Sequence, residues 1–515
     1  MKAGAARWGI AFSCGVVAAV LTLVTLGGLT TPPGWHDEAA YLLQAKLFAQ
    51  GKWAVPSPPL PEFFEQLHVL MVPKLAAKYP PGQALFLSPG VAVGLPGLMV
   101  ALGAGVTAAW LYMLVRARWN RVTGLGAVLF WLVSPMALYW RSSYLSEVTT
   151  SMLWLMGLLL AAEWWRRGGT RLSTALGAVV GVMAITRPLT ALAFAIPLAA
   201  ICIHRAMERH RMRDGMAALL AVIAIVAVLP VWALRTTGRI TRPPVSLYTA
   251  QYMPWDRMGF GLDPTLATRQ GPPDMAKWSE SFRDLHAHYT PRASLGTVEK
   301  RIAFVARDAF GRWWPLFACF VAVGCVALGR AGALVGAQAG ALFALYAIYA
   351  HFVTWDVYYL ELVAPACGCA AVGLAFLIRA LARRRAWTPS WYNRFLLATF
   401  VVLGTLLFAE ALVAAVQSVT RHDRQRHFLA LVAGINQKAI VFVKYGASHD
   451  VDAQFVGLLG PPGPTWVVHD LGARNSCLAA QESGRQTFRF DEDAARLYRV
   501  TLPTDSAVLR QLGCS

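Results

Sequence analysis

Two adjacent acids follow a histidine early in the chain, in the sequence Trp35-His36-Asp37-Glu38. They stand just beyond the first apolar run, where a charge must be solvated or paired. A carboxylate in such a place can act as a general base that takes a proton from a hydroxyl. The same acids also suit the first turn of a helix over Glu38–Gln50, because negative charge there favours the helix dipole. Spacing alone leaves both interpretations open.

A lysine precedes two prolines further along the same polar segment, in Lys78-Tyr79-Pro80-Pro81-Gly82. The prolines stiffen the backbone and prevent a helix from continuing. The ammonium of Lys78 can therefore be held toward an anion such as a phosphate. An interfacial lysine that reaches lipid head groups has the same appearance in a sequence, so this alternative also stays open.

Two later turns combine charge with aromatic residues. The turn 139–147 contains Arg141 and Glu147, for which a local ion pair is the simplest interpretation. The turn His351–Glu361 contains several aromatic side chains and two acids. Ionisable residues beside membrane spans are candidates for a functional site.

The composition of the chain is that of a membrane protein. Its 515 residues are 57% hydrophobic and only 14% charged, whereas a soluble domain is roughly a quarter charged. The mean hydropathy is +0.47. A helix of about 20 apolar residues crosses the hydrocarbon core, and backbone groups in lipid must bond internally. Apolar runs such as 10–29, 127–138, 216–234 and 395–416 predict an all-α polytopic fold with about eleven transmembrane helices.

The net charge of +20 is concentrated in short loops. Arginines gather beside the apolar runs at 116–121, 166–171, 204–213 and 383–385, which is the positive-inside signal. We therefore expect these loops and the amino end in the cytoplasm. The sequence contains no basic face with base-stacking aromatic residues, so no nucleic-acid partner is expected.

The segment Leu172–Ile203 fits either one long kinked helix or a hairpin of two short helices that meet at Arg187-Pro188. The loops before and after it are both strongly basic, so they belong on the same side of the membrane. A single span would separate them. The sequence therefore predicts a hairpin with Arg187 at its extracytoplasmic tip.

This topology predicts a transmembrane domain over residues 1–420 and an extracytoplasmic domain over residues 421–515. Two long external loops, 31–88 and 235–307, belong to the first domain. In the first loop, apolar residues at helical spacing predict a helix that lies in the membrane interface. These residues are Phe63, Phe64, Leu67, Leu70 and Met71.

The C-terminal domain has the pattern of a small α/β unit. Short β-rich runs alternate with turn residues, at 439–444, 466–469, 486–490 and 497–502. Cys477 and Cys514 flank its later part, and an oxidising compartment would allow them to form a disulfide. The sequence leaves both the paired and the free state open.

The order of these residues resembles that of the GT-C glycosyltransferases. Similarity is greatest to bacterial relatives of the protein O-mannosyltransferases and aminoarabinose transferases (glycosyltransferase family 39 and RgtA/B/C/D-like proteins). It is firm over residues 30–200, looser over the later spans and absent from the tail. The residues that carry it are Asp37-Glu38, Tyr41, Gly51, Lys78-Tyr79-Pro80-Pro81-Gly82, Arg141, Glu147 and Arg187-Pro188.

The resemblance implies a polyprenyl-phosphate sugar as donor and Asp37 as general base, with Glu38 and Glu147 as further catalytic candidates. We assign the donor phosphate to Lys78, Tyr79, Arg141 and Arg187, and the remaining substrate contacts to His36, Tyr41, Tyr358, Tyr359 and Glu361. The chain departs from its relatives in one late external turn. They often carry a basic residue before the tyrosine, where this chain has Tyr358 before Tyr359.

The expected chemistry agrees with these residue types. An acceptor hydroxyl needs a carboxylate to take its proton, and a phosphate leaving group needs cations to stabilise its developing charge. This predicts a single displacement with inversion. No cofactor is required by this scheme, although relatives differ in their use of a divalent ion (Mg²⁺ or Mn²⁺), for which Asp37 and Glu147 are the candidate ligands.

The expected partners are the lipid-linked donor, the bilayer, and a hydroxyl acceptor on a glycan, lipid or protein. The expected location is the bacterial inner membrane, with the tail domain in the periplasm. Two other functions suit a polytopic body, namely a transporter or flippase of a lipid-linked substrate and a non-catalytic membrane scaffold. The absence of an inverted repeat in the sequence and the few ionisable residues in mid-span disfavour a transporter.

Overall fold

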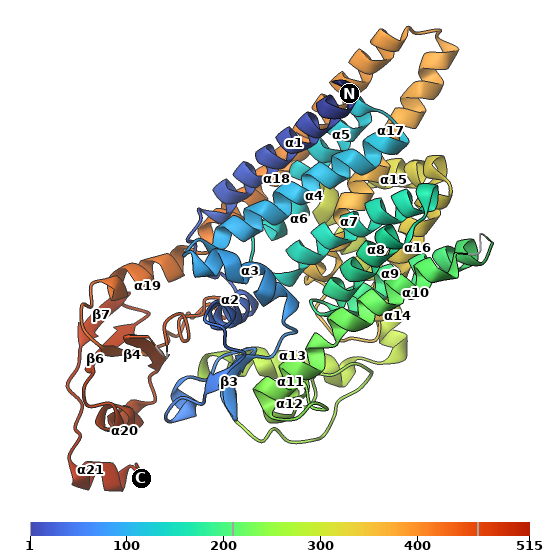
Figure 1. The fold of residues 1–515 in the computed structure, drawn as a ribbon. Coiled ribbons are helices and arrows are strands. Elements are labelled where there is room, and N and C mark those ends of the chain that lie inside the picture. The colour runs from blue at the N-terminus through green and yellow to red at the C-terminus, as the bar shows by residue number, and fades with distance from the viewer. Residues whose placement is uncertain (1, 209–210, 461–462, 515) are drawn as a thin grey trace.

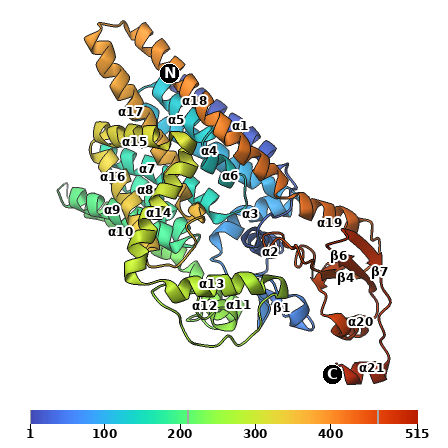
Figure 2. The same ribbon diagram turned by 180° about the vertical axis from the view of Figure 1, so that it is seen from behind.

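A computed structural model of the chain describes residues 2–208, 211–460 and 463–514. Residues 209 and 210 of the predicted basic loop lie outside this part. Figures 1 and 2 show a bundle of helices with smaller helices, short strands and a C-terminal unit gathered at one end. We call this end the loop face. The start of α1 (Lys2–Leu26) and the turn between α17 (Val363–Arg384) and α18 (Pro389–Thr420) lie at the other end.

The bundle consists of mostly apolar helices, as predicted. Besides α1, α17 and α18, they are α3 (Gly82–Ala92), α4 (Pro96–Arg118), α5 (Arg121–Leu132), α6 (Pro135–Arg141), α7 (Ser146–Arg167), α8 (Thr170–Ala184), α9 (Pro188–Glu208), α10 (Met212–Val226), α11 (Val228–Thr237), α14 (Pro291–Phe310), α15 (Trp314–Leu328) and α16 (Arg330–Tyr346). Two 3₁₀ turns, η3 (Gly311–Trp313) and η4 (Asp356–Leu362), lead into α15 and α17.

Within the described residues, seven helices are long and apolar enough to cross a membrane, or eight if the bent pair α5 and α6 is one span. The helical, polytopic fold class is thus confirmed. The count by length and composition is lower than the expected eleven, because turns divide some apolar runs. The break before Pro188, for example, leaves two apolar helices that are shorter than a full span.

Small residues bring neighbouring helices close together, as is common where lipid provides no hydrophobic drive for association. A Cβ atom added to Gly15 of α1 would lie 2.9 Å from the carbonyl oxygen of Gly105 in α4, and the reverse addition would meet Gly15 at the same distance. This contact fixes α1, and hence the loop that follows it, against α4. On its other side α1 packs against α18, which runs beside it along the bundle (Figures 1 and 2).

α8 and α9 form the predicted hairpin, with Arg187 at the tip between them. At the base of the hairpin, the Asp214 carboxylate of α10 accepts hydrogen bonds from the backbone N–H of Gly169 (3.0 Å) and the hydroxyl of Thr170 (3.1 Å). The start of α8 and the start of α10 therefore lie side by side. The two basic loops are on one side of the bundle, and the hairpin prediction is confirmed.

The two long loops fold into the layer that covers the loop face. The first forms α2 (His36–Ala49), η1 (Pro61–Phe63) and an antiparallel sheet with the order β1-β3-β2, made of β1 (Val55–Pro56), β2 (Val69–Leu70) and β3 (Lys74–Ala77). The second forms α12 (Pro244–Tyr252), η2 (Pro273–Met275) and α13 (Ala276–His288).

The predicted interfacial helix around Phe63 and Met71 is wrong. The segment consists of η1, an extended stretch and β2. Leu60 and His68 have positive φ angles of 45° and 67°, and such backbone conformations interrupt a right-handed helix. The apolar side chains are buried inside the protein, so their helical spacing arose from burial on more than one side.

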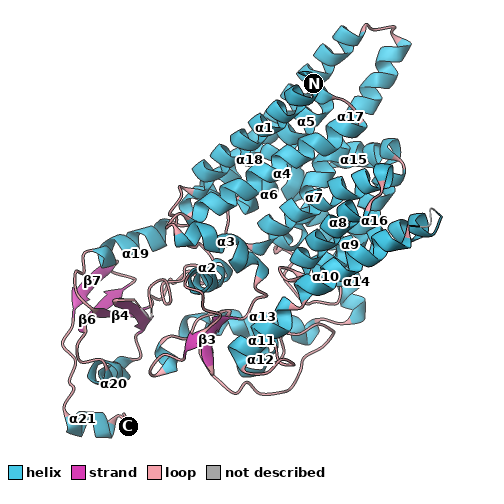
Figure 3. Cartoon of the chain, in the orientation of Figure 1, coloured by secondary structure: helices cyan, strands magenta, loops and turns pink. Residues whose placement is uncertain are grey.

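The tail folds into the predicted α/β unit, in which β4 pairs in parallel with β5 and β6, and β7 pairs antiparallel with β6. Its elements are α19 (Asp423–Ala433), β4 (Ala439–Lys444), β5 (Thr465–His469), η5 (Gly472–Arg474), α20 (Asn475–Gln481), β6 (Gln486–Asp491), β7 (Arg496–Arg499) and α21 (Ser506–Gln511). The sheet order is β5-β4-β6-β7. All four predicted strands are present, in magenta beside the helices in Figure 3. Cys477 and Cys514 form a disulfide that ties α21 to α20.

The tail packs directly on the first loop. The Phe63 ring lies 6.2 Å from that of Phe442 in β4, and the Phe64 ring lies 5.5 Å from that of Trp466 in β5, measured between centroids. Arg421, in the connection between α18 and α19, bonds to the carbonyl oxygen of Ser142. The tail and the loops of the bundle therefore form one continuous layer.

Candidate active site

Asp37 lies in the first turn of α2 and faces a cavity at the loop face. The Asp37 side chain keeps 42% of its surface exposed. Tyr79 donates a hydrogen bond to its Oδ1, and the Nε2 atom of His68 lies 3.5 Å from its Oδ2. The helix-start interpretation of the acids therefore holds, and it also directs one of them into a cavity.

The pKa of Asp37 lies below its ordinary value of 3.8. Burial raises this pKa, but the interactions with His68, the hydrogen bond from Tyr79 and the charge of Lys78 outweigh burial. Burial lowers the pKa of His68, although Asp37 opposes that effect. At neutral pH Asp37 is therefore an ionised hydrogen-bond acceptor.

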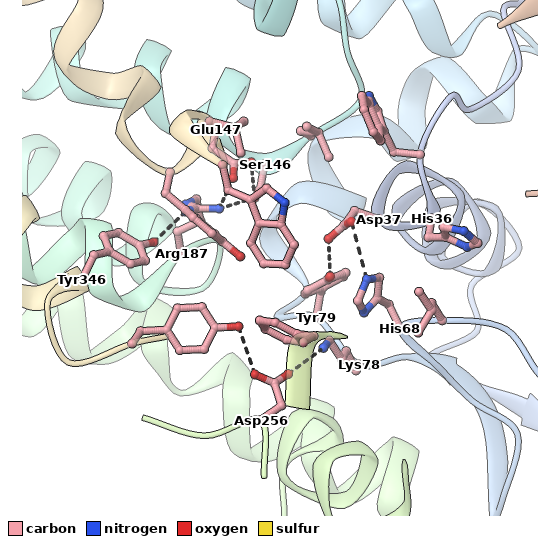
Figure 4. A pocket seen from close by; sticks show the side chains of 18 of the residues that line it. His36, Asp37, His68, Lys78, Tyr79, Ser146, Glu147, Arg187, Asp256 and Tyr346 are labelled. Carbon is pink, nitrogen blue, oxygen red and sulfur yellow. Dashed lines mark hydrogen bonds and ion pairs between the residues drawn. The ribbon is translucent and has the colours of Figure 1, made fainter. Parts of the chain in front are cut away.

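Lys78 is held at the end of β3 by the strand on one side and the two prolines on the other. Its backbone N–H donates to the carbonyl oxygen of His68 at 2.8 Å. Its Nζ lies 3.9 Å from Oδ2 of Asp256 and 4.8 Å from the ring centroid of Tyr248. Lys78 is buried, so the alternative of a lysine that reaches lipid head groups does not apply. Figure 4 shows Lys78, Tyr79, His68 and Asp37 close together.

Arg187, at the tip of the hairpin, is surrounded by groups that fix its guanidinium. It forms an ion pair with Glu147 in the first turn of α7. It donates to the hydroxyl of Tyr346 at 2.6 Å and to that of Ser146 at 3.2 Å. Its Nε lies 3.6 Å from Glu361. Glu147 thus pairs with the hairpin, and not with Arg141 as the local interpretation of the turn predicted.

Aromatic side chains connect Asp37 with Arg187. Tyr41 stacks on Tyr79 with ring centroids 4.7 Å apart and donates its hydroxyl to Ser146 at 3.0 Å. The Arg187 guanidinium lies 5.2 Å from the ring centroid of Tyr358. The base candidate and the arginine are therefore joined by one layer of tyrosines.

These side chains line one open cavity of about 1160 Å³ at the loop face (Figure 4). Segments that lie far apart in the sequence form its walls. The predicted site residues that line it are His36, Asp37, Tyr41, Lys78, Tyr79, Glu147, Arg187 and Tyr358. Its size is at the upper end of ordinary ligand sites, about 300–1,000 Å³, which leaves space for two substrates.

The C-terminal unit also reaches this cavity. The Nε2 atom of His36 lies 2.5 Å from the carbonyl oxygen of Val451, in the loop after β4. The next residue, Asp452, lines the cavity. The tail therefore contributes a wall of the site.

Arg141 does not belong to the cavity, in contrast to its predicted role at the donor phosphate. It is 3% exposed, and its Nη1 donates to the carbonyl oxygens of Trp131 (3.2 Å) and Leu132 (2.9 Å). These carbonyls end α5, where the helix itself supplies no donors. Arg141 therefore caps a helix C-terminus, which a basic residue commonly does.

Glu38 lies behind the cavity wall and does not line it. Its carboxylate accepts hydrogen bonds from the backbone N–H groups of Gly34 (2.5 Å) and Tyr144 (2.9 Å). The first of these contacts ties the start of α2 in the manner of a capping box. These bonds hold Glu38 in the start of α2, outside the cavity lining.

Two residues of the late external turn also lie behind the wall. The ring of Tyr359 stacks on Phe343 with centroids 4.3 Å apart. Glu361 accepts a hydrogen bond from the hydroxyl of Thr150 at 2.5 Å and faces Arg187. Neither side chain lines the cavity. Glu361 holds Arg187 from behind.

Asp37 and Glu147 do not form a common set of metal ligands. Asp37 is engaged by Tyr79 and His68, and Glu147 by Arg187. In the part of the chain that the structure describes, no group of three or more His, Cys, Asp or Glu side chains is arranged to hold a metal ion. The donor set therefore does not fit the divalent ion considered from the sequence.

Several cavity residues lie in segments that gave no clear signal in the sequence. Asp256 comes from the long loop, where it contacts Lys78 and accepts a hydrogen bond from Tyr349 at 3.0 Å. Tyr346 ends α16 and contacts Arg187. Asp256 follows a tryptophan in a polar loop, but only the folded chain brings it to the lysine.

Comparison with known proteins gives one family match. Residues 83–233 match the family described as dolichyl-phosphate-mannose-protein mannosyltransferase. This segment runs from α3 to α11 and includes the turn with Glu147 and the hairpin with Arg187. No curated protein matches the chain in sequence.

Solved structures extend the likeness over nearly the whole chain. The chain is similar to ArnT from Cupriavidus metallidurans bound to undecaprenyl phosphate, with a TM-score of 0.55 and 14% identity over 94% of this chain and 93% of that one. The apo state of the same ArnT gives a TM-score of 0.53 and 15% identity over the same shares of the two chains. The chain therefore has the fold of the GT-C glycosyltransferases, with a cavity at its loop face.

Proposed function

We propose that the protein transfers a sugar from a polyprenyl-phosphate donor to a hydroxyl group of an acceptor. The observation that carries this proposal is the cavity in which one ionised carboxylate, Asp37, accompanies two cations, the buried Lys78 and the partly buried Arg187. The undecaprenyl phosphate bound to the similar ArnT structure supports the class of donor. The family matched by residues 83–233 supports the transfer of a sugar.

In the proposed reaction, Asp37 takes the proton of the acceptor hydroxyl. The oxygen of that hydroxyl forms a bond to the anomeric carbon of the sugar. The bond between this carbon and the phosphate oxygen breaks, and its electron pair leaves with the phosphate. Tyr79 and His68 keep Asp37 ionised and oriented for this step. A single displacement of this kind inverts the anomeric configuration.

Lys78 and Arg187 are the proposed contacts of the leaving phosphate. Preorganised cations stabilise charge that develops in the transition state without having to reorganise. Glu147 and Tyr346 orient Arg187, and Asp256 orients Lys78. Arg141 has no part in this step because it is committed to the end of α5. Glu147 is a positioning residue in this scheme.

The topology supports an extracytoplasmic position for the loop face. The basic loops at the base of the α8–α9 hairpin are at the opposite end from Arg187, and basic loops are retained in the cytoplasm. The acceptor is then a glycan, lipid or protein on the outer side of a bacterial inner membrane. The donor lipid reaches the cavity from the bilayer around the bundle.

The direct test uses membranes that contain the protein and a panel of radiolabelled undecaprenyl-phosphate sugars. We expect transfer by the wild type and a loss of roughly 10²–10⁴-fold in kcat for D37N and D37A, since this is the usual contribution of a general base. E62Q is the matched control, because Glu62 lies in the same loop and pairs with Arg474 at the surface. Unchanged transfer in both Asp37 variants would remove Asp37 as the base. No transfer by the wild type from any donor would favour a transporter or a scaffold.

The proposed reaction uses protein cations in place of a divalent ion. We therefore expect EDTA treatment, followed by removal of the chelator, to leave the transfer rate within about twofold, because Lys78 and Arg187 already stabilise the leaving phosphate. A loss that added Mg²⁺ or Mn²⁺ restores would contradict the metal-free scheme.

A further inference from the structure

A second pair of acids lines the cavity, apart from the residues assigned to the transfer step. Asp308 lies in the last turn of α14, and Asp356 is the first residue of η4. Both side chains line the same cavity, and their carboxyl groups are close enough for each to affect the charge of the other. We call these two residues the acid pair.

The acid pair lacks a hydrogen-bond donor on one side. Asp356 is 2% exposed, and its Oδ1 accepts a hydrogen bond from Nε1 of Trp140 at 2.9 Å. Its Oδ2 receives no hydrogen bond from any described residue. Two ionised carboxylates in contact repel each other, and a buried acceptor without a donor is costly. The pair must share a proton or receive a donor group from a bound molecule.

The cations that line the cavity form ion pairs with other carboxylates and not with the acid pair. Lys78 and Arg187 are engaged by Asp256 and Glu147. Arg257 lies 3.4 Å from Asp263 in the long loop. Asp308 has no cationic partner among the described residues, and it is only partly buried, so its carboxylate remains open to the cavity. A ligand that approaches this wall meets hydrogen-bond acceptors and no positive charge.

Trp140 connects the acid pair to the proposed base. Its ring centroid lies 5.9 Å from that of Trp35, the residue that precedes α2, and both indoles line the cavity. Asp308, Asp356, Trp140 and Trp35 therefore form a continuous wall that ends beside Asp37. A sugar ring has hydroxyls at its edge and apolar C–H bonds on its faces. Carboxylates next to an amphipathic aromatic ring match both features.

We propose that the acid pair and Trp140 form the subsite for the hydroxyl groups of the transferred sugar while it is still attached to the donor. Asp308 accepts a hydrogen bond from a ring hydroxyl, Asp356 positions Asp308, and Trp140 supports the ring. This inference rests on the proposed function. The acid pair and Trp140 would select the sugar, and Lys78 and Arg187 would bind the phosphate in another part of the same cavity.

The position of the subsite favours the donor over the acceptor. Asp308 is followed by η3 and α15, which continue into the bundle, and the cavity wall beside it includes Ala414 and Gln417 of the membrane-spanning α18. A sugar on a membrane lipid approaches from this side. The tail, with Asp452, contributes another part of the wall that comes from outside the bundle. The acceptor has that part of the cavity available.

The subsite predicts strong discrimination by single hydroxyl groups. A site built to bond a hydroxyl rejects an analogue without it, because its own polar groups are then left without partners. A hydrogen bond to an ionised acceptor is worth enough that its loss weakens binding roughly 10- to 100-fold. One position of the sugar should therefore dominate selection of the donor.

The first experiment measures binding to the full-length protein in nanodiscs. The probes are undecaprenyl phosphate and the undecaprenyl-phosphate sugar that the wild type binds most tightly among glucose, mannose, galactose, N-acetylglucosamine and arabinose. For D308N we expect roughly 10- to 100-fold weaker binding of the sugar-bearing lipid and binding of undecaprenyl phosphate within about twofold of the wild type. E299Q is the matched control, because Glu299 is exposed on the same helix, and it should bind both lipids as the wild type does.

The second experiment pairs variants with monodeoxy analogues of that sugar. One deoxy position should weaken binding to the wild type and have little further effect in D308N, which is the pattern of a direct contact in a double-mutant cycle. D356N and W140F should reduce the same discrimination by a smaller factor. A residue with only a structural role would lower the binding of all analogues equally.

The outcomes separate this inference from the function on which it rests. If the wild type binds neither lipid, the polyprenyl-phosphate donor is wrong and the subsite with it. If both lipids bind but D308N treats sugars and analogues as the wild type does, the subsite is wrong and the function stands. Equal weakening of both lipids in D308N would also overturn the subsite, since Asp308 would then act on the phosphate or on folding.

Discussion

The cavity has two walls with opposite electrostatic arrangements. On the first, Lys78 and Arg187 each have a carboxylate within 4 Å, from Asp256 and Glu147. On the second, neither acid of the pair has a cationic partner among the described residues, and Asp356 accepts a hydrogen bond from Trp140. On the first wall, both cations already have carboxylate partners without a ligand, and these partners hold the cations in position to bind an anion. The second wall is incomplete and requires a donor from outside. Under the proposed function, this difference would fix the direction in which the phosphate and the sugar ring of the donor enter.

The largest expected effect comes from the removal of the arginine of the first wall. R187Q should lower kcat/KM roughly 10²–10³-fold, as the loss of one preorganised donor to a developing charge usually does. The measurement is transfer from a radiolabelled donor at subsaturating concentration. R166Q is the control, because Arg166 is an exposed arginine at the far end of α7. A loss of less than tenfold in R187Q would mean that the first wall is not the phosphate site.

A smaller effect is expected from the lysine of the same wall. K78M should raise the KM for the donor roughly 10- to 100-fold, because a hydrogen bond to a charged phosphate is lost. K74M provides the comparison, since Lys74 is exposed at the start of β3, the strand that Lys78 follows, and donates to the carbonyl oxygen of Arg235 at 3.0 Å. An equal rise in KM in the two lysine variants would indicate a general charge effect. It would contradict the assignment of Lys78 to a phosphate-binding wall.

The next effect concerns pH. Tyr79 donates to the ionised form of Asp37 and so lowers the pKa of Asp37. Without that bond the pKa rises, and the carboxylate becomes protonated at a higher pH as the solution is acidified. The acid limb of kcat/KM should therefore lie at higher pH in Y79F than in the wild type. Superimposable pH profiles would show that Asp37 does not control the acid limb.

The smallest effect on catalysis is expected for Arg141. R141M leaves the carbonyl oxygens at the end of α5 without a donor, which costs about 1–3 kcal/mol of stability for each buried group. The melting temperature in detergent should therefore fall, while kcat of the folded fraction stays within about twofold of the wild type. A selective loss of kcat with an unchanged melting temperature would contradict this structural role and would indicate that Arg141 acts with Lys78 and Arg187.

The contrast between Arg141 and Arg187 also shows how far the sequence can predict the site. Both arginines lie in turns between apolar runs, and the sequence assigned both to the phosphate. The positive-inside rule places Arg187 at the tip of a hairpin, because it uses charges on either side of the segment. No such rule reports that Arg141 lies beside the free carbonyl oxygens of α5. Helix ends are paired through tertiary contacts that a linear pattern does not contain.

Local sequence patterns predicted the structure correctly where a single helix or strand determines it. The four strands of the tail follow from β-rich runs between turns, and α2 begins at the predicted acids. They failed for the segment around Phe63, whose helical spacing reflects burial by two different partners. Asp256 and Asp308 were not singled out for the same reason, since their neighbours come from segments that are distant in the sequence. Asp356 was recognised only as one of two acids in the turn 351–361.

The contact between the tail and the first loop has a consequence for biosynthesis. His469 in β5 lies 2.6 Å from the carbonyl oxygen of Glu65, and the two residues are 404 positions apart. At the usual rate of translation, roughly 20–80 s separate their emergence from the ribosome. During this interval Phe63 and Phe64 lack the aromatic partners that β4 and β5 provide. The part of the cavity wall that contains Asp452 is likewise added only after the helices of the bundle have been made.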